Sequence, residues 1–421
     1  MNNMQSTIRY LISFLVRDDN AAGQVGYTSD EAQYTRYSVV IKPSGWLSQV
    51  GCPLQARRPE VFDFEGSPVL FGAPRLYRKG DTVVVEADWV ASSYYLLTRY
   101  EELQCEERDA HGRYTGEQSL LYQLDWLQRP LIEAYSNTLR ALLVAGGCLL
   151  PPIRPGKIVL THDIDASHRF HDLRSVLGGV RRRQWGLLRQ RLKGMDPYAD
   201  FAGIDRMDKA LPWAESVWFA HVAGKTGCAE DAHCIPLSVN DWLQSRTLSW
   251  GIHFSAMASQ QNSRLPQELA LFDCQAGHTA RACRYHYLML PDSDGWNCLQ
   301  QQGVTDDYSV GYADLPGFRL GTCRPVRHID PTTGELSDSL TLHPLSLMDV
   351  TLSDYARLPF REALSLADGI CRKACADGGE AVLLWHNSSL SQGASGYHRS
   401  LYIQLLDAWA ADGIGKPTDS L

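Results

Sequence analysis

Two aspartates one residue apart follow a short apolar run near the middle of the chain. The stretch is KIVLTHDIDASH, residues 157–168, in which Ile158–Leu160 gives way to Asp163 and Asp165. If the strand geometry persists, both carboxylates point to the same face, because strand side chains alternate with period two. Neighbouring carboxylates repel each other unless a cation or a shared proton stabilises them. The pair therefore indicates a cation site, acid–base chemistry, or both.

A D-x-D pair of this kind is compatible with several chemistries. One carboxylate can hold a divalent cation while the other serves as a base. The pair can also supply a nucleophile and an acid for phosphate transfer, or bind the metal and nucleotide-sugar of a glycosyltransferase. The structural alternative is a turn in which both carboxylates are solvated or cap the following helix. The pattern alone does not choose among these.

Further titratable residues follow other apolar runs of the chain. His253 ends LSWGIHFS, Arg284 and His286 alternate onto one face of ARACRYHYLML, and His386 follows EAVLLWHNS. An imidazole in such a place can bind zinc or transfer a proton, and an arginine fork can orient a carboxylate. Each residue taken alone is also compatible with a purely structural role.

The elements that must position these residues are recurring apolar runs separated by helical or irregular stretches. From residue 156 onward this alternation predicts a parallel sheet with crossover connections, either open or closed into a barrel. In such folds, ligands and catalytic groups gather at the carboxyl ends of the strands. We therefore expect the aspartates, histidines and arginine named above to converge at one edge of the sheet.

The part of the chain before this sheet has a different pattern. VVVEADW at 83–89 predicts a strand, whereas 92–103 and 127–149 have helical periodicity. The cluster Pro151–Gly156 is a typical boundary. We predict a smaller α+β domain over residues 1–150 and a larger domain over 156–421.

Composition narrows the class of protein. The chain has 421 residues, 44% of them hydrophobic, which is enough for two domains with substantial cores. A net charge of -8 argues against a nucleic-acid partner, and we interpret the run Arg181–Arg183 as a solvated helix face. The eleven cysteines have no repeating spacing and predict buried thiols in a reducing compartment. With no stretch of ~20 apolar residues and no leader pattern, we expect a cytoplasmic protein without a membrane span. The sequence does not indicate an oligomeric state.

Together these motifs resemble those of the NodB-homology polysaccharide deacetylases, carbohydrate esterase family four, in a divergent branch. Thr161–Asp165 is similar to the opening T-F-D-D-G motif and Leu384–His386 to the closing L-x-H motif, and the resemblance covers roughly residues 156–410. It implies a distorted parallel (β/α) barrel. RYEELQCEERDAHGRYTGEQSLL at 99–121 likewise resembles the uncharacterised domain that precedes such barrels.

The resemblance also implies roles for individual residues. Asp163 would be the general base, Asp165 and His253 would be metal ligands, Arg284 would orient the base, and His386 would be the general acid. The implied cofactor is a divalent metal, with zinc expected.

Two positions depart from the family's pattern. The family's H-[ST]-x-x-H motif has its second histidine where this chain has Met257, and Tyr287 stands where R-x-x-P has proline. The third protein ligand is therefore not identified. Nearby candidates are Ser255, Ser259, His162 and His168, although hydroxyls are poor zinc ligands.

The expected function is that of a metal-dependent hydrolase that removes N-acetyl or O-acetyl groups from a saccharide or a polysaccharide precursor. By the same resemblance, we expect Asp307 in TDDYSVGYAD and Arg319 in GYADLPGFRLGTCRP to bind the saccharide. A catalytically weak or inactive carbohydrate-binding or scaffold protein on the same fold is an alternative, because Met257 removes a ligand. A D-x-D glycosyltransferase and a phosphotransferase using Asp163 as nucleophile are others.

Overall fold

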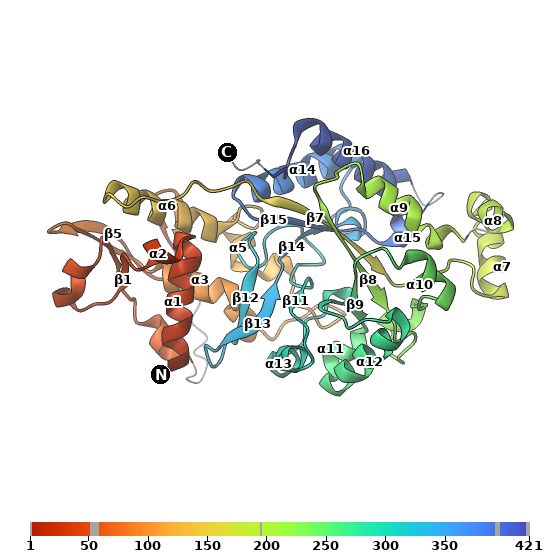
Figure 1. Cartoon of the computed structure of the whole chain (residues 1–421), viewed down its shortest axis with the longest axis horizontal. Helices are drawn as coiled ribbons and strands as arrows, with labels where there is room; N and C mark the ends of the chain where they lie inside the picture. Colours follow the sequence, from red (N-terminus) through yellow and green to blue (C-terminus); the bar gives the residue numbers. More distant parts are fainter. Residues whose placement is uncertain (1, 51–58, 194–195, 392–395, 418–421) are drawn as a thin grey trace. The chain divides into compact units, whose positions relative to one another are not determined.

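The chain folds into two compact units in a computed structural model that describes residues 2–50, 59–193, 196–391 and 396–417 (Figure 1). The first unit comprises Met1–Glu107, Glu117–Arg154 and Phe318–Asp338, and the second comprises Arg108–Gly116, Pro155–Gly317 and Ser339–Leu421. The units are thus not two consecutive stretches of sequence. Residues 108–116 interrupt the first unit's sequence but belong to the second.

The first unit is built on a four-stranded sheet. Its order is β1 (Val25–Tyr27), β2 (Val39–Ile41), β6 (Thr82–Ala87) and β5 (Gly72–Lys79). The first three strands are parallel and β5 is antiparallel to β6. The remaining strands of this unit are β3 (Phe62–Phe64), β4 (Ser67–Val69) and β12 (Val326–Ile329). Its helices are α1 (Asn2–Val16), α2 (Asp19–Ala22), α3 (Trp89–Leu97), α4 (Tyr100–Leu103), α5 (Leu120–Gln123) and α6 (Leu131–Ala145).

The predicted strand and helices of this unit are present, but the bounds of the two helices differ from the prediction. The strand predicted at 83–89 is β6. The helix predicted at 92–103 is divided into α3 and α4, because Arg99 between them has a left-handed backbone with φ of 53°. The helix predicted at 127–149 is shorter, since Pro130 is the N-cap of α6 and Gly146 its C-cap.

The larger sheet is a curled sheet of nine strands, which lie mainly in the second unit, except that β12 at its end belongs to the first. The order is β12, β13 (Leu336–Leu342), β11 (Asp306–Asp307), β10 (Ala282–Tyr285), β9 (Trp250–Phe254), β8 (Glu215–His221), β7 (Lys157–Ile164), β15 (Glu380–Leu384) and β14 (Leu345–Met348). All the pairings from β13 to β14 are parallel. The apolar runs recognised in the sequence are β7, β8, β9, β10 and β15.

Helices follow most of these strands and cover the sheet (Figure 1). They are α7 (Leu173–Arg181), α8 (Trp185–Leu192), α9 (Phe201–Asp208), α10 (Val239–Ser245), α11 (Ala256–Gln260), α12 (Leu265–Ala276), α13 (Ser293–Gln301), α14 (Phe360–Ala376), α15 (Asn387–Leu390) and α16 (Gly396–Asp412). Among them α14 packs against β7 and β15, and α12 packs against β9. The sheet's inner side chains, among them Val159, Phe219 and Leu384, form a buried core.

This architecture is a mixed α/β fold with an open, curled sheet. The prediction of a distorted parallel barrel is confirmed in part. The strands β13 to β14 are parallel, but β12 and β14 are the two ends of the strand order and do not pair to close a ring. No helix in the described part of the chain is long and apolar enough to cross a membrane.

Candidate active site

A cavity of about 270 Å³ lies at the carboxyl ends of the strands of the second unit. Its lining includes Asp163 and Asp165 at the end of β7, His253 on β9 and His386 just after β15. The strand register explains this convergence. Parallel neighbours are paired so that the last residues of β7, β9, β10 and β15 reach the same edge of the sheet. The structure therefore brings together residues that the sequence separates by more than two hundred positions.

Asp163 is held in place by the buried guanidinium of Arg284. The Nη1 group of Arg284 donates to Asp163 Oδ1 at 3.0 Å and to Thr161 Oγ1 at 2.7 Å. Its Nε donates to the carbonyl of Tyr308 at 3.0 Å, and the guanidinium lies 4.7 Å from the centre of the Phe219 ring. The arginine thus orients one carboxylate oxygen and leaves Oδ2 of Asp163 toward His253, 3.6 Å away.

Asp165, His253 and His286 form a second set of contacts, which we call the outer group. Asp165 Oδ1 lies 3.0 Å from His253 Nε2 and 3.7 Å from His286 Nε2. Although these atoms are close, Asp165 Oδ1 and His253 Nε2 are buried and neither has a well-formed hydrogen bond within the described residues. Ligand atoms that face a common point without bonding one another are typical of a metal site, and these three residues satisfy that geometry.

The tautomer of His253 supports this interpretation. Its Nδ1 lies 3.0 Å from the carbonyl of Arg284, which can only accept a hydrogen bond. The proton of the neutral ring is therefore on Nδ1, and Nε2 presents a lone pair to Asp165. Burial alone would lower the pKa of His253, but the carboxylates of Asp163 and Asp165 outweigh it and raise the pKa. The site attracts positive charge, whether as a proton or as a metal cation.

His286 follows β10, directly before a sharp turn of the chain. Tyr287 and Leu288 have left-handed backbones with φ of 59° and 54°. A non-glycine residue in that region costs on the order of 1–3 kcal/mol and such strain is concentrated at functional sites. The strand ends at Tyr285, and the turn follows directly after His286, whose Nε2 lies 3.7 Å from Asp165 Oδ1.

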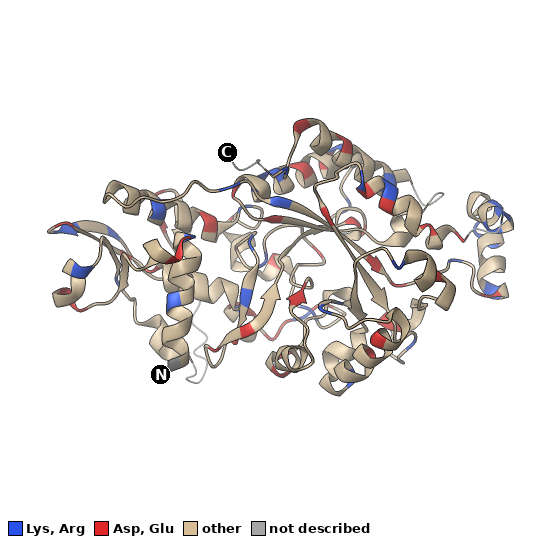
Figure 2. Ribbon diagram, in the orientation of Figure 1, with Lys and Arg blue, Asp and Glu red and all other residues tan. Residues whose placement is uncertain are grey.

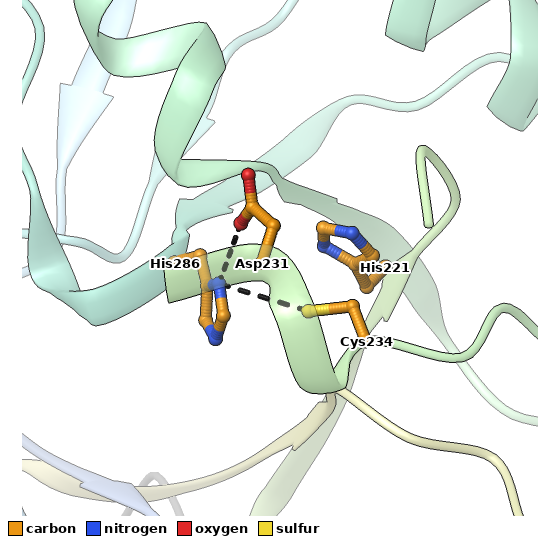
Figure 3. A group of neighbouring side chains, drawn as sticks. All are labelled: His221, Asp231, Cys234 and His286. Carbon is orange, nitrogen blue, oxygen red and sulfur yellow. Dashed lines mark hydrogen bonds and ion pairs between the residues drawn. The ribbon is translucent and has the colours of Figure 1, made fainter. Parts of the chain in front are cut away.

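His286 also belongs to a second cluster, the inner group of His221, Asp231, Cys234 and His286 (Figure 3). All four side chains are buried. The Nδ1 of His286 lies 2.9 Å from Asp231 Oδ1 and 3.8 Å from Cys234 Sγ. By composition this group is as suitable for a metal as the outer group.

Hydrogen bonds distinguish the two groups. Asp231 also accepts from the backbone N–H of Ala256 at 2.9 Å, from that of Met257 at 3.3 Å and from the Thr226 hydroxyl. Burial alone would raise the pKa of Asp231, but the hydrogen bonds from His286 and Thr226 outweigh it and lower the pKa. Asp231 is therefore an anion that fixes the proton of His286 on Nδ1, so Nε2 is free to act as a ligand in the outer group.

His386 has its own buried carboxylate partner. Its Nδ1 donates to Asp349 Oδ1 at 2.8 Å, its backbone N–H donates to Asp349 Oδ2 at 3.0 Å, and its Nε2 lies 3.7 Å from Asp165 Oδ2. Burial alone would lower the pKa of His386, but Asp349, with Asp165 and Asp163, outweighs it and raises the pKa to about 10. The imidazole therefore carries a proton near neutral pH and directs Nε2 toward Asp165.

The segment 108–116 braces the cavity from outside the sheet. Arg113 lines the cavity, and its Nη1 donates to the carbonyl of Tyr287 at 2.9 Å while its Nη2 donates to the hydroxyl of Tyr355 at 3.0 Å. Asp109 accepts from its Nε at 2.8 Å. Arg113 thus stabilises the strained turn that follows His286.

Other residues considered in the sequence lie elsewhere. Asp307 is fully buried and accepts from Trp296 Nε1 at 3.0 Å and from the backbone N–H of Ser309 at 2.6 Å, which makes it a structural carboxylate of β11. Arg319 belongs to the first unit, where its guanidinium donates to both oxygens of Glu102. The structure therefore does not place Asp307 in the cavity, and it gives Arg319 a partner within its own unit.

His286 lies beside Asp165 and His253, whereas the residues considered near Met257 have other partners. His162 is buried between the carbonyl of Trp385 and Asp208, and His168 bonds to Ser167. Ser255 and Ser259 bond to Glu268 and to the Ala256 carbonyl. Met257 does not line the cavity.

Three residues of this arrangement were given no role in the sequence analysis: His286, Asp231 and Asp349. His286 had a signal, because it alternates with Arg284 onto one face. Asp349 lies in HPLSLMDVTL, which ends an apolar strand as the other site residues do. Asp231, on a short helix from Glu230 to His233, had no pattern to mark it.

Comparisons with known proteins add limited information. A family of unknown function, DUF7033, matches residues 6–146. No curated protein matches the chain. Among solved structures, a candidate polysaccharide deacetylase from Mycobacterium smegmatis is similar over 63% of this chain and 87% of its own, with 16% identity and a TM-score of 0.40.

Two further structures are similar at a TM-score of 0.35 each. One is a candidate glycoside hydrolase/deacetylase from Parabacteroides distasonis, with 7% identity over 62% of this chain and 68% of its own. The other is a 4-alpha-glucanotransferase from Thermococcus litoralis, with 12% identity over 61% of this chain and 38% of its own. These similarities are partial, so function has to be argued from the cavity itself.

Proposed function

We propose that this protein is a metal-dependent hydrolase that removes acetyl groups from a saccharide or saccharide precursor. N-acetyl groups are the first choice of substrate group. The observation that carries the proposal is the arrangement around Asp165. Its Oδ1 faces two imidazole nitrogens, while an oriented carboxylate, Asp163, and a protonated imidazole, His386, lie on either side. This set combines a cation site, a base and an acid in one cavity.

The residues of the outer group fit a divalent cation. Asp165 Oδ1 and His253 Nε2 are buried polar atoms without hydrogen bonds in the described residues. Because the proton of His286 is on Nδ1, its Nε2 has a free lone pair and can be the third metal-binding atom. Two histidines and one carboxylate are a ligand set typical of catalytic zinc. A cation bound there would polarise the acetyl carbonyl and lower the pKa of a water molecule.

The chain's own residues supply the proton transfers. Asp163, with one oxygen held by Arg284, would accept a proton from the attacking water through its other oxygen. His386, protonated because of Asp349, would donate a proton to the leaving amine or alcohol. Arg284 and Asp349 position these two groups from behind, away from the reacting atoms.

The saccharide part of the proposal is supported by the motif resemblance and by the cavity's walls. Tyr287 and Tyr355 line the cavity and present apolar rings with polar hydroxyls, which suits a ring substrate with hydroxyl groups. The alternative of an inactive binding protein depended on the lost ligand at Met257. His286 beside Asp165 and His253 would supply a third donor, which favours the hydrolase over that alternative.

The test is release of acetate from N-acetylated oligosaccharides by protein loaded with zinc. We expect Asp163→Asn to lower kcat by on the order of 10²–10⁴-fold, because the general base is lost. Asp407→Asn, an exposed aspartate on α16, is the matched control and should retain wild-type activity. No acetate from zinc-loaded wild-type protein across N- and O-acetylated substrates would refute the proposal.

A further inference from the structure

The segment between β7 and β8 contains a helical hairpin with exposed apolar side chains. Helices α7 and α8, residues 173–193, follow Asp165 in the chain before β8 begins. Large apolar side chains on this hairpin are exposed, with Leu173 at 74%, Trp185 at 61% and Leu192 at 87% of full accessibility. On α7 and α8 only Gly179 and Leu187 are buried, so these exposed apolar side chains need an explanation.

The hairpin already has an internal packing face. Leu187 and Phe170 are buried, and Gly179 is closely approached by both Phe170 and Leu188. The exposed residues are different ones. Leu173, Leu177 and Val180 recur at i, i+4 and i+7 and form one stripe along α7, while Trp185 and Leu192 are seven apart on α8. On α7 this stripe is separate from Gly179, whereas on α8 Trp185 and Leu192 flank Leu188 on one face and remain exposed beyond the packing contact.

Basic residues surround these apolar stripes. Between 173 and 193 the sequence contains seven cationic side chains and no carboxylate: Arg174, Arg181, Arg182, Arg183, Arg189, Arg191 and Lys193. Figure 2 shows the concentration of basic residues on α7 and α8. The whole chain has a net charge of -8, so this patch is opposite in sign to the rest of the protein.

We infer that the α7–α8 hairpin binds the surface of a membrane that contains anionic phospholipids. A helix with an apolar stripe, a tryptophan and flanking arginines is typical of segments that lie in the headgroup region of a bilayer. The cations would interact with lipid phosphates, and the leucines and Trp185 would enter the boundary of the acyl chains. A purely polar partner would account for the arginines but not for the exposed apolar stripes.

The position of the hairpin gives this surface a consequence for the site. It follows Asp165 in the chain and belongs to the same compact unit as the cavity. Binding through α7 and α8 would therefore attach the unit that carries the cavity to the bilayer surface. This inference does not rest on the proposed reaction, since membrane binding is measured without turnover.

The experiment is sedimentation of the full-length protein with vesicles. We expect wild-type protein to bind vesicles of phosphatidylcholine and phosphatidylglycerol in equal parts, and not vesicles of phosphatidylcholine alone. The triple variant Arg181→Glu/Arg182→Glu/Arg183→Glu should bind at least on the order of 100-fold more weakly. Arg246→Glu/Arg281→Glu/Arg361→Glu makes the same charge change at exposed positions outside the hairpin and should bind like wild type.

A second variant separates a membrane from a soluble polyanion. Trp185→Ser/Leu192→Ser keeps every charge and should lose most vesicle binding, while its thermal unfolding should match wild type because both side chains are exposed. Equal binding to the two kinds of vesicle would overturn the inference. An equal loss of vesicle binding in the control triple variant would also overturn it. Unchanged binding of the serine variant would overturn it too, because the arginines alone would then account for binding to the anionic vesicle surface.

Discussion

The outer and inner groups share His286 but differ in what their atoms are free to bind. The inner group, with a cysteine, a carboxylate and two histidines, has four side chains of types that bind zinc, one more than the outer group. Its carboxylate, however, is already satisfied by side-chain and backbone donors. In the outer group, Asp165 Oδ1 and His253 Nε2 face each other and neither has a hydrogen-bond partner among the residues that the structure describes. Residue types alone would favour the inner group, whereas the hydrogen bonds favour the outer group.

The position of the proton on His286 decides which of the two groups receives the lone pair of this imidazole. A neutral imidazole carries its proton on one nitrogen, so His286 can offer a lone pair to only one group at a time. Asp231, an anion held at 2.9 Å, draws the proton to the inner side. The inner group is then the support of the outer group, since a carboxylate behind a ligating histidine fixes its orientation and raises its basicity.

The largest effect that tests this comparison comes from His286 itself. We expect His286→Ala to lose bound zinc and to lower kcat/KM by at least on the order of 100-fold, because one of three ligands is removed. Metal content is measured by mass spectrometry on purified protein. Met257→Ala, at the position where the family motif places its histidine, should retain zinc and activity. Zinc loss in Met257→Ala with retention in His286→Ala would contradict the assignment.

The next effect concerns the carboxylate behind the ligand. Asp231→Asn should weaken zinc binding by roughly 10–100-fold, because the uncharged amide holds the His286 proton less strongly. Competition with a chelating dye gives the affinity. Asp241→Asn, which changes a buried capping carboxylate on α10, controls for general destabilisation and should bind zinc as wild type does. Equal affinities for Asp231→Asn and wild type would show that the inner group does not support the outer one.

A third prediction concerns the pH dependence of the general acid. Because Asp349 raises the pKa of His386, the protonated, active form persists to high pH, and activity falls only as pH passes this raised pKa. Asp349→Asn removes the neighbouring charge, so the alkaline limb of kcat should move to lower pH by roughly 1–3 units.

The matched control for this shift is a similar pair outside the cavity. His343 lies between Glu380 and Asp306, whose carboxylates outweigh burial and raise its pKa to about 9. Asp306→Asn should leave the pH profile of kcat in place. A shift of equal size in both variants would mean that the limb does not report His386.

The smallest effect is expected from the cysteine of the inner group. Cys234→Ser should change zinc content and activity by less than about twofold, since the burial and nearby carboxylates that raise the pKa of this thiol keep it protonated. The readout is zinc content alongside His286→Ala prepared in parallel. If zinc falls as far in Cys234→Ser as in His286→Ala, the metal lies in the inner group.

Much of the site's framework could be predicted because it depends on local patterns. Apolar runs of strand length marked β7, β8, β9, β10 and β15, and the alternation of side chains placed Asp163 and Asp165 on one face. Because parallel strands bring their carboxyl ends to one edge of a sheet, Arg284, His253 and His386 could be expected to lie close together. These inferences need only the geometry of a strand and the general form of an α/β sheet.

The sequence by itself thus determined the strands and the polar residues at their ends, whereas the tertiary structure decided which of these residues share an atom-scale site. His286, the candidate third donor, is followed by a left-handed turn at Tyr287 and Leu288, a backbone state that no side-chain pattern predicted. Asp231 and Asp349 become partners of histidines far away in the chain only after the sheet has formed. Arg113 reaches the cavity from a segment whose sequence neighbours belong to the other unit. Periodicity is a local property of the chain, but ligand sets and proton positions depend on long-range contacts, which only the folded structure supplies.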